Sequence, residues 1–462
     1  MKAKLLFFWL DVPRKFVWTP FWWIILSAVV LAVPVLRIWW WLFIPFFIML
    51  KLQVVYLWWL GWDYQYNKSK WIILEIIPPK EILAPLSAME DVFSVIWSVI
   101  DTANWRETWC EGELPSCPYW LSWEIASIEG SIHFYVRCLA PHRHVVESVL
   151  FSHYPDIEIN QVTDYTRVVP QNIPNDEWDL YGEDYILARE DCYPIKTYTK
   201  FFEPQGERIS AEEKRIDPMI SLLEGMARIG PGEHVWFQMI TTPISDNEIP
   251  WKDEAKKVIE KISRRPTKKK KTIGSELSEM FSEFFAGMTT TAGEDSKEKS
   301  LSPALTEGGE KEMILTPGER EILTGVEEKI KKLAYKTNLR GMYMAKKSVW
   351  KGENGKIVRA YFSHFAAQNM NHIRFSGKTR SKVHYVFRAK RKHLRQKRLF
   401  VNYVMRFPSL FPEMLGEGNS IFNTEELTTI YHFPNKLSGM LAPSSAQVDA
   451  KKGGPPSNLP VE

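Results

Sequence analysis

The chain has 462 residues and contains 59 Lys and Arg against 55 Asp and Glu, so its net charge is only +4 at pH 7. Its length exceeds what one domain of about 150 residues needs, so several domains are expected. The balance of charge excludes a protein that is basic or acidic throughout, and four cysteines in so long a chain exclude a disulfide scaffold. Electrostatic recognition must therefore come from local clusters.

The N-terminal 62 residues are strongly apolar. Two runs, Phe16 to Leu36 and Ile38 to Trp59, are each close to the ~20 residues that a helix needs to cross a bilayer. Tryptophans stand at the ends of both runs, as in the aromatic belts of membrane proteins. We therefore predict a transmembrane helical hairpin over residues 1–62. Lysines and arginines precede the first run and follow the second, so both ends are expected on the cytoplasmic side. This predicts a multi-pass protein of the cell membrane with its body in the cytoplasm.

Two alternatives to the hairpin remain open. Lys51 and Gln53 weaken the second run, because a lysine inside a span must reach the interface or face a partner. One span followed by an interfacial helix would place the body outside. A cleaved signal peptide fits less well, because its apolar core would have only about 7–15 residues.

The body opens with alternating strand and helix patterns over residues 71–165. A strand pattern is followed by helical spacing, a hairpin around Glu129-Gly130, a second helical pattern and an extended segment. The corresponding ranges are Trp71 to Ile77, Glu81 to Asp101, Leu121 to Ile128, Ser131 to Arg137, His142 to Tyr154 and Asp156 to Gln161. This βαββαβ order predicts a ferredoxin-like domain.

A second domain is predicted over residues 185–263 and 317–412, which makes the fold class α+β. Tyr198 to Phe202 and His234 to Thr241 resemble strands around a helix. Residues 264–316 lose periodicity and fill with Lys, Glu, Ser, Thr and Gly, which predicts a disordered insertion. Acidic residues gather in Asp176 to Asp191, so local fields of both signs are expected.

Motifs that carry catalysis or bind nucleotides are missing from the sequence. It has no G-x-x-x-x-G-K-[ST], G-x-S-x-G or H-E-x-x-H motif. The spacings of Cys110 with Cys117, and of Cys138 with His142 and His144, match no zinc pattern. We therefore predict no catalytic residues, no cofactor and no metal site, and expect that the protein is not an enzyme.

A basic segment from Lys378 to Arg398 interleaves cations with Tyr385, Phe387 and Leu394. Phosphate contact combined with stacking requires this mixture of residue types. The candidate contact residues are Arg388, Lys390, Arg391, Lys392 and Arg395. Three interpretations stay open: contact with nucleic acid, attraction to anionic lipid headgroups, or a solvated face without a specific ligand.

The C-terminal residues 423–462 combine a short helix with a linker. Asn423 is placed to cap a helix, with Glu426 three residues further on, and Pro434 ends it. The Pro- and Gly-rich tail that follows is typical of a linker. We predict that the helix docks on a partner through Asn423, Glu426, Leu427 and Tyr431.

Several of these segments together resemble the region ahead of the motor in TraG-like and HerA-like ATPases of type IV secretion and conjugative DNA transfer. They are the apolar hairpin, the Trp71 to Ile77 strand with Pro78-Pro79-Lys80-Glu81, the Leu121 to Arg137 hairpin, Asn423 to Pro434 and the tail from Ala450 to Pro460. In that family a RecA-like hexameric motor follows the linker. The sequence here reaches Glu462 without a Walker motif, so ATP hydrolysis does not carry over.

The resemblance implies a non-catalytic, homo-oligomeric, membrane-anchoring subunit of a machine that translocates DNA or protein. Its motor would be a RecA-like or HerA-like ATPase on a separate chain. The alternative is a membrane-tethered nucleic-acid-binding protein that acts alone.

Overall fold

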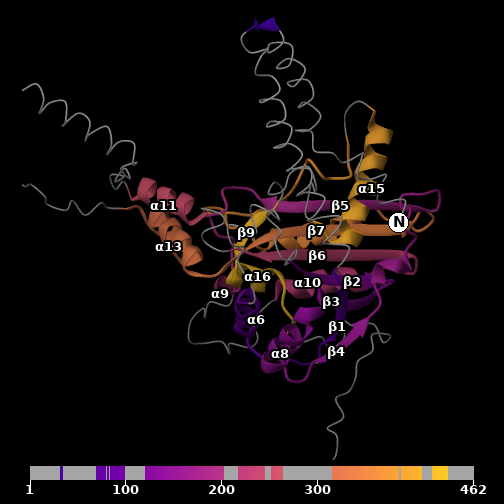
Figure 1. The fold of residues 1–462 in the computed structure, drawn as a ribbon, viewed down its shortest axis with the longest axis horizontal. Helices are drawn as coiled ribbons and strands as arrows, with labels where there is room; N and C mark the ends of the chain where they lie inside the picture. Colours follow the sequence, from indigo (N-terminus) through magenta and orange to yellow (C-terminus); the bar gives the residue numbers. More distant parts are fainter. Residues whose placement is uncertain are drawn as a thin grey trace, which may run out of the picture.

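The computed structural model describes residues 32–34, 69–79, 81–82, 84–98, 120–201, 217–244, 251–263, 315–383, 387–407 and 419–434. Its strands form one nine-stranded antiparallel sheet in the order β4-β1-β3-β2-β6-β7-β5-β8, with β9 paired to β7 (Figure 1). The strands are β1 (Trp71–Ile77), β2 (Leu121–Ile128), β3 (Ser131–Leu139), β4 (Glu158–Val162), β5 (Trp178–Leu187), β6 (Glu233–Pro243), β7 (Ala334–Lys346), β8 (Ile373–Phe375) and β9 (Ser420–Asn423).

The helices connect these strands; most of them cover the sheet, whereas α11 and α13 project to one side of it (Figure 1). They are α6 (Ser87–Trp97), α8 (Arg143–His153), α9 (Tyr198–Phe201), α10 (Pro218–Ala227), α11 (Trp251–Ile262), α13 (Pro317–Lys331), α14 (Ile357–Ser363), α15 (Arg388–Met405) and α16 (Thr424–Ile430). Short 3-10 turns are η2 (Ala140–His142), η3 (Tyr165–Val168) and η4 (Asn354–Lys356). Tyr198–Phe201, which the sequence pattern predicts as a strand, is the short helix α9.

The sheet consists of two halves with the same order of elements. The first half runs β1-α6-β2-β3-α8-β4 and places its strands as β4-β1-β3-β2. The second runs β5-α10-β6-β7-α14-β8, with α11 and α13 between β6 and β7, and places its strands as β8-β5-β7-β6. The halves join where β2 pairs antiparallel with β6, from Leu121 opposite Thr241 to Ile128 opposite His234. The two predicted α+β bodies therefore share one continuous sheet, which corrects the predicted fold class.

The halves differ in how their second and third strands are connected. The turn Glu129-Gly130 joins β2 to β3 with φ values of 54° and 95°, the positive values that a two-residue type I′ hairpin requires. The connection from β6 to β7 instead runs through residues 244–333. The two strands nevertheless pair without a break from Glu233 opposite Ala345 to Pro243 opposite Tyr335.

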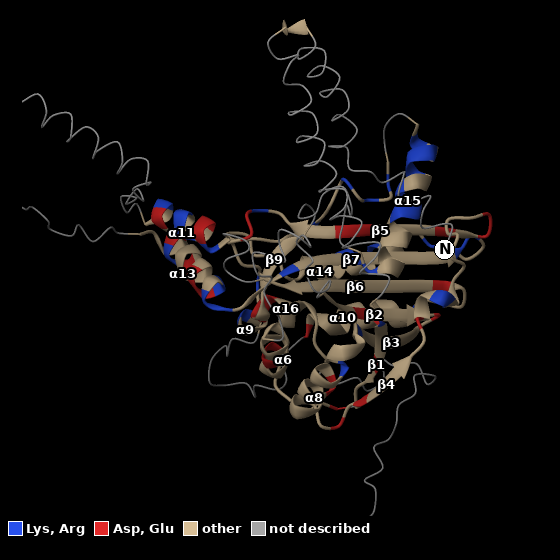
Figure 2. Ribbon diagram, viewed as in Figure 1, with Lys and Arg blue, Asp and Glu red and all other residues tan. Residues whose placement is uncertain are grey.

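The described part of the chain contains no helix that is both long enough and apolar enough to cross a membrane. Its longest helices, α15 and α13, have 18 and 15 residues and carry charged side chains along their length, because only one face of each packs against the body (Figure 2). The predicted spans Phe16 to Leu36 and Ile38 to Trp59 lie outside the described residues, except for 32–34. This finding contradicts the predicted transmembrane hairpin and the multi-pass location in the cell membrane.

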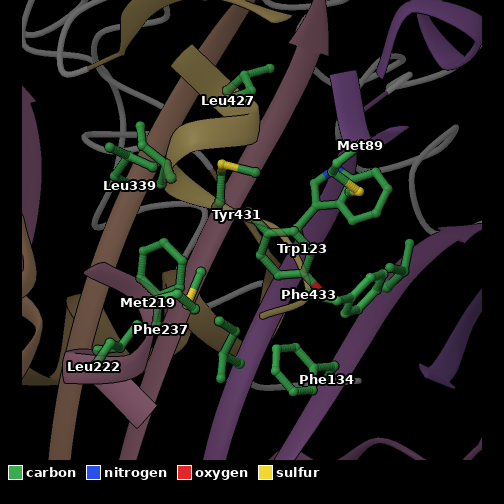
Figure 3. Packing of buried hydrophobic residues seen from close by; sticks show 14 of the residues in the cluster. Met89, Trp123, Phe134, Met219, Leu222, Phe237, Leu339, Leu427, Tyr431 and Phe433 are labelled. Carbon is green, nitrogen blue, oxygen red and sulfur yellow. The ribbon is translucent and has the colours of Figure 1, made fainter. Parts of the chain in front are cut away.

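The larger core lies between one face of the sheet and helices α6, α8, α10, α14 and α16 (Figure 3). Its centre is aromatic: Trp123 of β2 lies 5.0 Å from Phe93 and 5.4 Å from Tyr431, measured between ring centroids. Phe433 packs edge-on against Phe134 and Tyr154. The segment that ends at residue 434 is therefore part of the core and not an appendage.

A buried ion pair holds this last segment to α10. The Nε2 atom of His432 lies 3.0 Å from both carboxylate oxygens of Asp217, and its Nδ1 atom lies 2.9 Å from the carbonyl oxygen of Thr428. Both ring nitrogens thus face acceptors, which favours the charged imidazolium. Burial alone would lower the pKa of His432, but Asp217 outweighs it and raises that pKa above the usual 6.5. The pKa of Asp217 lies below its usual 3.8, because His432 and the Met219 amide outweigh burial.

The pair makes stability depend on pH in a defined way. The raised pKa of His432 contributes to the free energy of unfolding. This contribution is complete below pH 6.5 and is lost as pH rises through the folded-state pKa. The lowered pKa of Asp217 gives a second contribution to stability, which is complete above pH 3.8 and is lost as pH falls through the folded-state pKa. We expect His432→Gln to destabilise most between these limits and progressively less at alkaline pH, measured as the free energy of unfolding in urea. The exposed His144→Gln is the control, and a pH-independent difference for His432→Gln would contradict the ion pair.

Candidate nucleic-acid interface

Helix α15 lies on the sheet face opposite to the larger core. Its C-terminal half is anchored there by Leu399, Phe400 and Tyr403, which are buried in a second apolar cluster with Trp236 and Met342. Its N-terminal half extends past the edge of the sheet and carries most of its Lys and Arg residues (Figure 2). One helix therefore has a fixed end and a projecting basic end.

A row of polar side chains crosses the sheet beneath the anchored end. Glu124 of β2, Gln238 of β6, Arg340 of β7 and Asp184 of β5 are successive cross-strand partners. Direct partners in antiparallel strands point to the same face, so all four side chains lie on the α15 side. Arg340 Nε lies 2.6 Å from Asp184 Oδ1, Arg340 Nη1 lies 3.1 Å from Gln238 Oε1, and Gln238 Nε2 lies 2.9 Å from Glu124 Oε1. We call these four residues the polar row.

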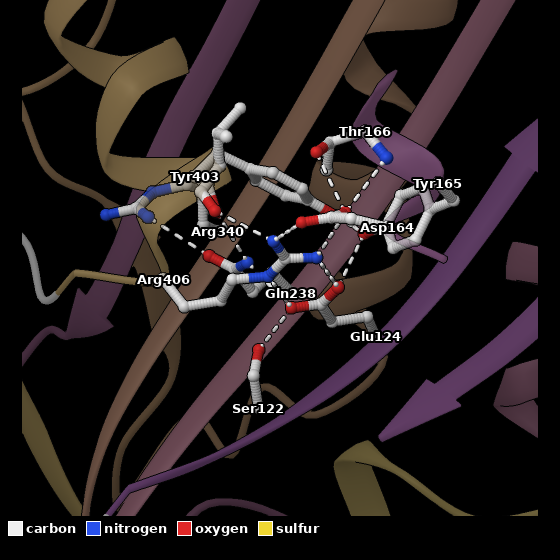
Figure 4. A network of polar contacts seen from close by, with 10 residues as sticks. Ser122, Glu124, Asp164, Tyr165, Thr166, Gln238, Arg340, Tyr403 and Arg406 are labelled. Atoms are coloured by element: carbon white, nitrogen blue, oxygen red, sulfur yellow. Dashed lines mark hydrogen bonds and ion pairs between the residues drawn. The ribbon is translucent and has the colours of Figure 1, made fainter. Parts of the chain in front are cut away.

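Arg406, the residue after α15, joins the helix to this row (Figure 4). It has a left-handed backbone with φ of 55°, and its side chain is 1% exposed. Its guanidinium donates to both Glu124 oxygens at 3.0 and 3.1 Å, and to both Asp164 oxygens at 2.5 and 3.0 Å. The polar row also donates to the helix end, from Gln238 to the Tyr403 carbonyl at 3.1 Å.

The charges in this network hold one another in the ionised state. Burial alone would raise the pKa of Glu124, but the charge and hydrogen bonds of Arg406 outweigh it and lower that pKa. The same balance lowers the pKa of Asp164. Burial disfavours the charge of Arg406, and Glu124 and Asp164 more than compensate, so its pKa rises. The end of α15 is thus fixed by hydrogen-bonded charges, of which Arg406 and Glu124 are buried and Asp164 is 25% exposed.

The five basic residues predicted from the sequence all lie on α15, but they divide into two groups. Arg388, Lys390 and Arg391 are exposed on the projecting half. Lys392 and Arg395 are half-buried and hold the helix to the body. Lys392 Nζ lies 3.1 Å from Asp179 Oδ2, and Arg395 Nη1 donates to the carbonyl oxygens of Gly377 and Arg380 at 3.3 and 3.1 Å.

Further basic residues beside α15 are missing from the prediction. Exposed Arg374 lies in β8, and exposed Lys382 lies on the chain that leaves it. Arg359 and Arg380 both pair with the buried carboxylate of Glu183, and their Cζ atoms lie 4.7 and 4.5 Å from the centroid of Phe375. The sequence contained a signal for this surface, because no Asp or Glu occurs between Glu353 and Glu413.

The structure places all four predicted docking residues inside the body. Asn423 and Glu426 form a capping box on α16, with hydrogen bonds of 2.8 and 3.0 Å, and Glu426 also pairs with buried Lys329 at 3.0 Å. Leu427 and Tyr431 have no exposed surface. The helix predicted from the sequence is present, but these side chains stabilise the protein's own core and do not form a surface for a partner.

The cysteine and histidines that the sequence places close together differ in exposure. Cys138 is buried in β3, which raises its pKa to about 12, whereas His144 is exposed on α8. Burial likewise raises the pKa of Cys192 to about 11. Within the described ranges, no three His, Cys, Asp or Glu side chains gather as a metal site would need. Cys110 and Cys117 lie outside the described residues.

Comparisons with known proteins do not place the chain in a family. No protein-family model matches it, and no curated protein matches it either. The resemblance to TraG-like and HerA-like proteins therefore stays a prediction.

Removing a carboxylate from the buried network at Arg406 should cost much more stability than removing one from an exposed ion pair. Glu124→Ala would leave a buried guanidinium with Asp164 as its remaining carboxylate, so we expect a loss of about 3–5 kcal/mol in the free energy of unfolding. The matched control is Glu224→Ala, which removes the exposed pair between Glu224 and Arg228. It should cost less than about 1 kcal/mol. Equal losses for the two variants, measured by urea unfolding, would contradict this account of the anchor.

Proposed function

We propose that the protein is a non-catalytic nucleic-acid-binding subunit and that the projecting half of α15 contacts the phosphate backbone. The observation that carries the proposal is the contrast between the two ends of this helix. Its C-terminal end is held by the ion pairs of the buried Arg406 guanidinium, whereas Arg388, Lys390 and Arg391 at the other end are exposed. A rigid helix that presents cations away from the protein's own acids is suited to binding a polyanion.

The neighbouring surface supports the same choice over a solvated face. Arg374 and Lys382 extend the positive surface beside α15, and residues 354–412 contain no Asp or Glu. The nearby acids of β5 are paired with other cations, Asp179 with Lys392 and Glu183 with Arg359 and Arg380. Phe387 is 77% exposed and has a φ of 56°, which a bulky side chain rarely adopts. Leu394 is 55% exposed on the same helix. Apolar groups among cations favour a ligand that offers both phosphates and stacking faces.

The salt dependence of binding provides a quantitative test. We expect the full-length chain to bind a fluorescent oligonucleotide with an affinity that falls linearly with salt on a logarithmic plot. Replacing Arg388, Lys390 and Arg391 together with Ala should weaken binding and reduce the slope by roughly 0.9 per lost phosphate contact, so by about 3 on duplex DNA. Fluorescence anisotropy between low and moderate salt measures both quantities.

A variant with the same loss of charge elsewhere serves as the control. Lys257, Lys261 and Lys331 are exposed on α11 and α13, away from α15 in the fold. Replacing these three with Ala should leave the slope at the wild-type value. No binding by the wild type, or equal effects of the two triple variants, would refute the proposed contact.

The wider role that we propose rests on the resemblance to TraG-like and HerA-like proteins. In this role the body is a component of a DNA- or protein-translocating machine whose motor is an ATPase on another chain. Because residues 420–434 belong to the core, removing them would damage the fold itself. A docking test must therefore keep the chain through Pro434 and vary only residues 435–462.

Co-purification tests this wider role separately from nucleic-acid binding. We expect the full chain, isolated from its own cells by an affinity tag, to bring with it a P-loop ATPase identified by mass spectrometry. The chain that ends at Pro434 should unfold at the same temperature but lose the ATPase if the tail provides the contact. Absence of any P-loop protein from the full-length sample would contradict the proposed motor partner.

A further inference from the structure

The sheet has one end strand on each side. In the described part of the chain, β4 pairs with β1 alone and β8 pairs with β5 alone. After β8 the chain continues along β5, with hydrogen bonds from Ser376 to the Asp184 carbonyl at 2.7 Å and from Ser381 to the Gly182 carbonyl at 3.2 Å. Each end therefore presents an edge, and such edges can pair with further chains unless charge or shape prevents it.

The two edges carry opposite charge. No Lys or Arg occurs between Arg143 and Arg167, and within this stretch Asp156 is exposed and Glu158 is half-buried at the start of β4. Arg143 donates to Gln161 of β4 at 2.8 Å, but its charge is paired with Glu147 at 2.6 Å. At the other end, Arg374 and Lys382 are exposed on and after β8. Pairing two identical edges would bring like charges together, whereas pairing β4 with β8 brings opposite charges together. Charge thus favours contact between different ends of two copies.

The directions of the strands allow the same contact. Every neighbouring pair along the path from β4 to β8 is antiparallel, and this path contains eight strands. The end strands therefore run in opposite directions. When β8 of one copy lies beside β4 of the next, their pairing is antiparallel and both copies keep the same orientation. The molecule already uses such a joint internally, where β2 of one half pairs with β6 of the other.

We propose that copies of this chain associate head to tail, with the β4 edge of one copy against the β8 edge of the next. Asp156 and Glu158 face Arg374 and Lys382 of the neighbouring copy. The contact is heterologous, so it extends into rings or filaments and does not stop at a two-fold dimer. It leaves Arg388, Lys390 and Arg391 on the projecting half of α15 available for nucleic acid, but it takes up Arg374 and Lys382 of the surface beside that helix.

Charge reversal at one edge at a time tests this arrangement without nucleic acid. By light scattering after size exclusion, the full-length wild type should exceed the monomer mass at low salt and dissociate as salt is added. The double variants Asp156→Lys with Glu158→Lys, and Arg374→Glu with Lys382→Glu, should each be monomeric, because each retains only one original edge and like charges oppose pairing.

Mixing the two variants with each other, without wild type, gives the sharpest test, because each variant keeps the original edge that the other has lost. An equimolar mixture of the two variants retains one original β8 edge and one original β4 edge, which should pair into a 1:1 dimer and not grow further through original edges. The two reversed edges are also complementary, so longer assemblies in the mixture likewise support the proposal. A mixture that stays monomeric, or a wild type that is monomeric at every salt and protein concentration, overturns it.

Matched controls separate the edges from charge in general. Glu327→Lys with Glu328→Lys, and Lys257→Glu with Lys261→Glu, make the same charge changes at exposed positions of α13 and α11. Both should keep the wild-type mass. If these controls dissociate to the same extent as the edge variants, net charge and not the edge contact governs association, and the proposal fails. Loss of DNA binding by the α15 variants has no bearing on this result.

Discussion

The anchoring of α15 depends on a few buried charges at the middle of the sheet. Arg406 contacts Glu124 and Asp164 from the first half, while Arg340 and Gln238 come from the second half. Ionised groups without water are costly to bury, and a network of this kind is stable only when every member keeps its partner. The same contacts therefore join the two halves and fix the direction of the helix that crosses their boundary.

This central network gives the two faces of the sheet different tasks. The face covered by α6, α8, α10, α14 and α16 buries a large aromatic core that supplies most of the apolar burial. The face under α15 combines a smaller apolar cluster with the polar row. A helix placed on an apolar face alone could shift along it, because apolar contacts have little directional preference. Hydrogen-bonded charges have strict geometry and so define one position for the helix.

Local sequence patterns predict the elements better than their partners. The Glu129-Gly130 turn and the capping residues Asn423 and Glu426 occur where the sequence places them, because turn and cap signals act within a few residues. The acidic run at residues 176–191 instead suggests a charged surface. Glu183 and Asp184 within it are each 1% exposed, because arginines more than 150 residues later in the chain neutralise them. Such pairs leave no local pattern, so β5 and the repeated second half are hard to recognise from sequence.

The candidate site shows the same division between local and distant information. Composition alone identifies the cations of α15. It cannot distinguish Arg391, which is exposed, from Arg395, whose guanidinium donates hydrogen bonds to backbone carbonyls. The docking residues illustrate the converse error. A capped amphipathic helix near a chain end can face a partner or the protein's own core, and only the tertiary contacts of Leu427 and Tyr431 distinguish the two.

The long connection between β6 and β7 has a consequence for how the chain can vary. Its register is set by eleven facing pairs, from Glu233 with Ala345 to Pro243 with Tyr335, and not by the geometry of a tight turn. Doubling the length of a flexible loop costs only about 0.6 kcal/mol in closure entropy. This hairpin can therefore accept or lose sequence between α11 and α13 with little effect on the sheet. It is the natural position for inserting a fluorescent or affinity domain, whereas the two-residue turn of the first half offers no such freedom.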